Sequence, residues 1–127
     1  MNLRCVALYL AFACSGSAGA ETGTVDSRLL DYTRNSLNLS LCAVVFEEEH
    51  GDRNLADQYQ NGSAQAEALI REGGWSDEEA LRAHELVLQD DFSFTLPPDT
   101  TWGAFRKTHF SRELCDGALA SVASQRE

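Results

Sequence analysis

The sequence predicts an all-α protein, a small helical bundle of four to five helices with one disulfide. Apolar residues recur at the 3.6-residue spacing of an amphipathic helix over residues 26–49 and again in later segments. Residues typical of helix N-caps stand just before several of these segments. Once a leader at the amino terminus is set aside, Cys42 and Cys115 are the two cysteines that remain.

The first 20 residues have the three parts of a secretory signal peptide. Arg4 supplies the positive charge, an apolar run extends from Cys5 to Cys14, and small residues end at Ala18-Gly19-Ala20. The run is far shorter than the roughly 20 residues that span a bilayer, so we expect cleavage after Ala20 and no membrane attachment afterwards. A lipoprotein with Cys14 as its attachment site is the alternative. We therefore expect a signal peptide, 1–20, and a single helical domain, 21–127, in the periplasm or outside the cell.

The chain is strongly acidic. It contains 20 Asp and Glu against 10 Lys and Arg, a net charge of −10 with neutral histidines, which becomes −11 when Arg4 leaves with the leader. A surface of this sign disfavours nucleic acid and anionic membranes as partners and favours a basic protein. Acidity that serves only solubility is the alternative interpretation.

The two remaining cysteines predict one structural disulfide between Cys42 and Cys115. Disulfides are characteristic of exported proteins, and no third cysteine of the mature chain competes. Their separation of 73 positions excludes a C-x-x-C redox motif. In the chain-entropy model, a loop of this size contributes roughly 4 kcal/mol to stability.

The first two helices are expected over residues 26–48 and 53–71. In the first, capped by Asp26 or Ser27, the expected buried stripe is Leu30, Leu37, Leu41, Val44 and Val45. Three glutamates, 47–49, follow at the end where the helix dipole disfavours anions, so they are either a contact for a partner or a solvated charge run. In the second helix, Asn61-Gly62-Ser63 predicts a kink or a break, because these are poor helix formers.

The remaining segments are shorter. Ser76 with Glu79 forms a capping box for a helix that ends near Asp91. Residues 92–101 predict an extended loop, since Pro97-Pro98 cannot continue a helix. Thr101 is then expected to cap a short helix, and Ser111 a final one.

The residues form no recognisable catalytic or metal-binding pattern. The histidines His50, His84 and His109 lie far apart, and none has the i, i+4 spacing of paired zinc ligands. We therefore expect no metal, no cofactor and no enzymatic activity. His50 is interpreted as a surface residue of a turn and His84 as a buried core residue.

Two segments resemble the type VI secretion amidase immunity proteins, which are small exported helical proteins. The first is the helix from Tyr32 through Ser40-Leu41-Cys42-Ala43, and the second is Phe110-Ser111-Arg112-Glu113-Leu114, an aromatic residue followed by S-[KR]-E-L. Length, export and acidity agree with the family. The family places its second cysteine shortly before the S-[KR]-E-L motif, near Phe105 in this chain, whereas Cys115 directly follows the motif here.

The resemblance implies an all-α bundle that often forms homodimers and that inhibits a secreted cell-wall amidase. Inhibition is implied to occur by occlusion, with a loop between late helices entering the active-site cleft. By position this loop is residues 89–101, and its expected contact residues are Asp90, Asp91, Phe94, Pro97, Pro98 and Asp99. The alternative is a periplasmic structural or chaperone-like helical protein without an enzyme target.

Overall fold

The computed structural model describes residues 24–127 and confirms the all-α fold with five helices and no strand in that range. The helices are α2 (Ser27–Glu48), α3 (Arg53–Glu72), α4 (Asp77–Asp91), α5 (Trp102–His109) and α6 (Arg112–Gln125). The expected cleavage site after Ala20 and the alternative lipid site at Cys14 lie outside the described residues. None of the described helices has both the length and the apolar character needed to cross a bilayer.

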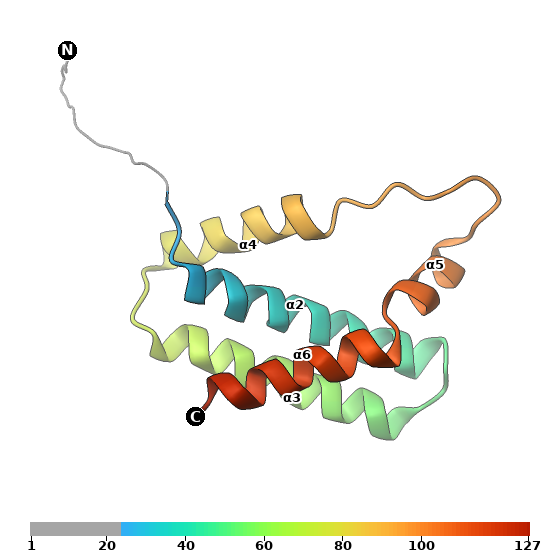
Figure 1. Ribbon diagram of the computed structural model, residues 1–127, viewed down its shortest axis with the longest axis horizontal. Helices are drawn as coiled ribbons and strands as arrows, with labels where there is room; N and C mark the ends of the chain where they lie inside the picture. Colours follow the sequence, from blue (N-terminus) through green and yellow to red (C-terminus); the bar gives the residue numbers. More distant parts are fainter. Residues whose placement is uncertain (1–23) are drawn as a thin grey trace, which may run out of the picture.

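The core lies between α2, α3 and α6. Figure 1 shows α2 and α3 running antiparallel, with α6 alongside both and α4 on the other side of α2. The apolar side chains of this core come from α2, α3, α6 and Phe110, and they include Leu39, Val45, Phe46, Tyr59, Ala66 and Val122. The disulfide between Cys42 and Cys115, both fully buried, confirms the predicted pair and joins α2 to α6 within this core.

The predicted helix starts are confirmed. Asp26 accepts from the backbone N–H of Arg28 at 2.9 Å, and the capping box forms, with the Ser76 hydroxyl accepting from Glu79 N–H at 3.1 Å. Thr101 and Ser111 cap α5 and α6 in the same way. Each cap satisfies an N–H group that has no partner within its own helix.

The buried face of α2 differs from the predicted stripe. Leu29, Leu39 and Cys42 are fully buried, whereas Val44 is 38% exposed and the other members of the stripe before it are half-buried. The reason is that α2 lies between two layers. Its deeply buried side, which includes Val45 of the predicted stripe, meets α3 and α6, while other members of the stripe line pockets towards α4 and α5 that are covered incompletely.

The predicted break in α3 is absent. The helix is continuous from Arg53 to Glu72, and Gly62 and Ser63 are buried in it. A Cβ atom on Gly62 would lie 2.5 Å from Cδ1 of Leu119 and 3.0 Å from Cδ1 of Leu39, so the glycine makes room for the ends of these two leucine side chains. Small residues that weaken an isolated helix serve here as a packing contact.

Two other interpretations of polar residues change. His84 is exposed and is therefore not a core residue. Two of the three glutamates at the end of α2 form ion pairs, Glu47 with Arg53 at 2.9 Å and Glu49 with Arg106 at 2.8 Å. These internal pairs account for carboxylates at a helix end that the dipole disfavours.

Candidate functional site

The candidate site is the segment between α4 and α5, residues 92–101, which we call the arm. Figure 1 shows the arm running outside the helical bundle before it returns to α5. The nitrogens of Pro97 and Pro98 have no hydrogen to donate, so the arm around them cannot form a helix; α4 itself ends earlier, at Asp91. The extended loop predicted here is confirmed.

The tip of the arm is a tight turn over residues 97–100. The N–H of Thr100 donates to the Pro97 carbonyl at 3.3 Å, and Asp99 has a positive φ of 67°. A proline at the second position and a positive φ at the third are typical of a type II turn. Pro97, Pro98 and Asp99 are exposed. The tip is thus a stiff turn that presents two prolines and one carboxylate to solvent.

The base of the arm is braced by aromatic contacts. The ring of Phe94 lies 5.0 Å from that of Phe105 and 4.7 Å from the imidazole of His109, and Phe92 packs against the core. Phe94 is half-buried. The structure therefore places Phe94 at the base, where it holds the arm on α5, and not at the exposed tip.

The three predicted aspartates lie in different environments. Asp91 forms an ion pair with Arg34 of α2, which also pairs with Asp31 at 3.1 Å. Asp90 and Asp99 are exposed, and neither forms an ion pair within residues 24–127. Asp91 consequently anchors the start of the arm, while Asp90 and Asp99 are the carboxylates available to a partner.

An apolar pocket of about 220 Å³ opens at the base of the arm. Trp102 and Leu88 are 53% and 42% exposed at this pocket. The remaining lining residues come from α2, the arm, α5 and the residue after α5: Leu41, Phe92, Phe94, Phe105, Arg106 and Phe110. Sequence reasoning missed this pocket because its walls come from segments far apart in the chain. The aromatic pair Trp102 and Phe105, three residues apart on α5, was the only local signal.

Arg106 links this pocket to the end of α2. Its Nη2 donates to Oε2 of Glu49, but its Nε is buried and has no hydrogen-bond partner among the described residues. The guanidinium stays protonated, so Nε is always a donor, and a buried donor without an acceptor costs about 1–3 kcal/mol.

The described residues contain no group of side chains that could hold a metal ion. Within residues 24–127, no three His, Cys, Asp or Glu side chains come together as metal ligands, and both cysteine sulfurs in that range are in the disulfide. The arm and the pocket at its base form the candidate site because they combine an exposed, stiff turn with a partly exposed apolar hollow. Comparison of the chain with protein-family models, curated proteins and solved structures found no match.

Proposed function

We propose that this protein is an exported inhibitor that binds a peptidoglycan-degrading amidase and occludes its active-site cleft with the arm. The observation that carries the proposal is the construction of the arm. A turn of Pro97, Pro98 and Asp99 is exposed at the tip, outside the bundle, while Phe94 and the Asp91–Arg34 ion pair brace its base. A segment that only connects two helices needs neither the stiff tip nor the braced base.

Preorganisation supports a binding role for the arm. Proline has a fixed φ, and the turn hydrogen bond at the tip restricts the arm further. A loop that is already ordered loses little conformational entropy on binding, so more of the contact energy appears as affinity. Asp90 and Asp99 suit basic groups at the mouth of a cleft, and the acidic charge of the chain favours approach to a basic surface.

The pocket at the base supplies a second contact. Exposed tryptophan beside an apolar hollow is typical of the centre of a protein interface, where a few aromatic side chains contribute most of the binding energy. Trp102 and Leu88 have this character.

The disulfide supports the exported location. Structural disulfides form in oxidising compartments, including the periplasm, and are rare in the reducing cytosol. A buried bond between α2 and α6 fits a protein that folds after export.

The experiment that tests the proposal is capture followed by an activity assay. The purified, disulfide-bonded protein is immobilised and exposed to periplasmic extract, and captured proteins are assayed for release of peptide from peptidoglycan. We expect an amidase whose hydrolysis falls in proportion to added inhibitor. A captured amidase with unchanged activity would contradict occlusion, and retention of many unfolded proteins without an amidase would favour the chaperone-like alternative.

A further inference from the structure

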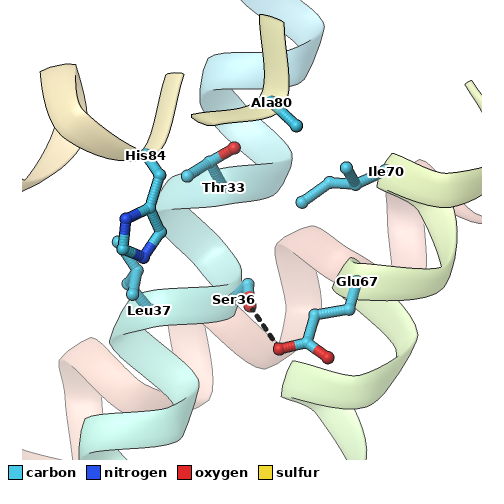
Figure 2. A pocket seen from close by; sticks show the side chains of 7 residues that line it. All are labelled: Thr33, Ser36, Leu37, Glu67, Ile70, Ala80 and His84. Atoms are coloured by element: carbon cyan, nitrogen blue, oxygen red, sulfur yellow. Dashed lines mark hydrogen bonds between the residues drawn. The ribbon is translucent and has the colours of Figure 1, made fainter. Parts of the chain in front are cut away.

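A second pocket lies between α2, α3 and α4, near the start of α4 and away from the arm at its end. Its volume is about 200 Å³. Figure 2 shows His84 from α4 and Glu67 from α3 on opposite sides of the α2 residues Thr33 and Ser36. This pocket and the one at the base of the arm share no lining residue, although His84 and Leu88 are only one turn apart on α4.

The walls of this pocket combine an apolar channel with one carboxylate. Leu37, Ile70 and Ala80 provide the apolar part. The Thr33 hydroxyl already donates to the Leu29 carbonyl at 2.7 Å, so its donor is not available to a ligand. Glu67 is exposed and forms no ion pair within residues 24–127. Its carboxylate accepts one side-chain hydrogen bond there, from the Ser36 hydroxyl to Oε2 at 3.4 Å.

The size and the ligands of the pocket restrict its occupant. Pockets for cofactors and drug-sized molecules are usually about 300–1,000 Å³, so about 200 Å³ suits a single side chain. A metal ion needs at least three protein ligands in sites of this kind, and no such group occurs in the described part of the chain. The apolar wall beside the carboxylate of Glu67 matches an apolar stem that ends in a cation.

We propose that this pocket accepts a lysine side chain of a protein partner. The four-carbon stem lies along Leu37, Ile70 and Ala80, and the ammonium group donates to Oε1 of Glu67. Arginine fits less well, because its guanidinium is a broad planar fork, whereas the lysine ammonium is a compact charge that suits a pocket of about 200 Å³. The acidic net charge of the chain favours the approach of such a partner.

The test is an NMR titration of the purified, disulfide-bonded protein with three blocked tripeptides, Ala-Lys-Ala, Ala-Arg-Ala and Ala-norleucine-Ala. Norleucine has an apolar stem without the charge. We expect the lysine peptide to shift the amide signals of Ser36, Glu67 and His84, with affinity about threefold or more above either other peptide. Glu67→Gln should remove that preference. Glu85→Gln, an exposed neighbour of His84 that does not line the pocket, removes the same charge and should retain it.

A further variant separates charge from shape. Ala80→Leu fills the pocket but leaves Glu67 in place, so it should abolish the shifts. Equal responses to the lysine and norleucine peptides would overturn the proposal, as would equal effects of Glu67→Gln and Glu85→Gln. Because the assay needs no amidase, its failure leaves the proposed inhibition by the arm untouched.

Discussion

Tyr59 shows how a single residue joins the core to the surface. Its side chain is fully buried, and its hydroxyl donates to Oδ1 of Asp116 at 2.7 Å, while Asp116 also accepts from Arg112 at 2.9 Å. Two causes raise the pKa of Tyr59 to about 12: burial, which has the larger effect, and the hydrogen bond to Asp116. Burial disfavours the charged phenolate, and the nearby carboxylate disfavours it further.

This raised pKa predicts a loss of stability in alkali. A tyrosine in the unfolded chain has a pKa near ~10, so between about pH 10 and 12 the unfolded state releases a proton that the folded state retains. The contribution of Tyr59 is therefore complete below pH ~10 and is lost as the pH rises towards 12. Urea unfolding at pH 8 and pH 11 measures this loss.

Two substitutions isolate the effect. Tyr59→Phe should lower the free energy of unfolding at pH 8 by about 1–2 kcal/mol, because the hydrogen bond to Asp116 is lost. The same substitution should also reduce the difference between the free energies of unfolding at pH 8 and at pH 11. Tyr32→Phe, at a half-buried position, is the control and should leave the pH dependence unchanged. The same pH dependence in Tyr59→Phe and in the original protein would show that Tyr59 is not its source.

At the scale of the helices, the structure contains two contrasting glycines. Gly62 of α3 lies against Leu39 and Leu119, whereas Gly117 of α6 has no atom within 4 Å of the position that a Cβ would take. In an open helical position, alanine is more stable than glycine by about 1 kcal/mol. In a close contact, the added atoms must displace neighbours, which typically costs about 1–3 kcal/mol.

The different surroundings of the two glycines predict that a larger side chain stabilises the protein at position 117 and destabilises it at position 62. Gly117→Ala should raise the free energy of unfolding by about 0.5–1 kcal/mol. Gly62→Val should lower it by about 1–3 kcal/mol, since its branched side chain cannot avoid both leucines. Urea unfolding measures both changes. A stabilising Gly62→Val would mean that α3 and α6 do not approach as closely as described.

The helix starts were predictable from sequence because each depends on a few neighbouring residues. Ser76 and Glu79 satisfy each other's backbone groups within one turn, so no distant segment is needed. The buried face of α2 and the uninterrupted α3 were not predictable, because both depend on which helix packs where. Glycine weakens an isolated helix, but at position 62 it leaves room for Leu39 and Leu119. The local sequence does not show which of these two roles a glycine has.

At the scale of the whole molecule, the fold class and the disulfide were predictable, and the candidate site only partly. Pro97 and Pro98 showed that residues 92–101 leave the helical pattern. The sequence did not show that Asp91 pairs with Arg34, that Phe94 braces the base, or that Leu41, Leu88 and Trp102 share one pocket. Each of these contacts joins segments that only the folded chain brings together.

The disulfide predicts a strong dependence of global stability on the oxidation state. Cys42 and Cys115 close a loop of 73 residues between α2 and α6, which should contribute roughly 4 kcal/mol. Reduction or the double substitution to Ser should lower the free energy of unfolding by about that amount. Because both cysteines are fully buried, thiol labelling of the reduced protein under native conditions, after the reductant has been removed, should be slow and should accelerate in urea. Two thiols that react at once without denaturant would contradict the described core.

The central claim is that the arm binds the active-site cleft of a cell-wall amidase. Asp90→Asn with Asp99→Asn removes the two available carboxylates, and asparagine tolerates the positive φ at position 99. Asp91 is left unchanged because it pairs with Arg34. The matched control, Asp57→Asn with Glu72→Gln, removes the same charge from exposed positions on α3.

The decisive measurement is the Kd of both double variants for the captured amidase, by titration calorimetry at one salt concentration. We expect the first double variant, changed at the tip of the arm and at the end of α4 beside its base, to bind about 30-fold or more weakly, because charged contacts are lost at an interface. The control should bind within about twofold of the original protein, since isolated surface charges contribute little. Equal Kd values for the two variants would contradict the account and exclude the arm as the inhibitory contact.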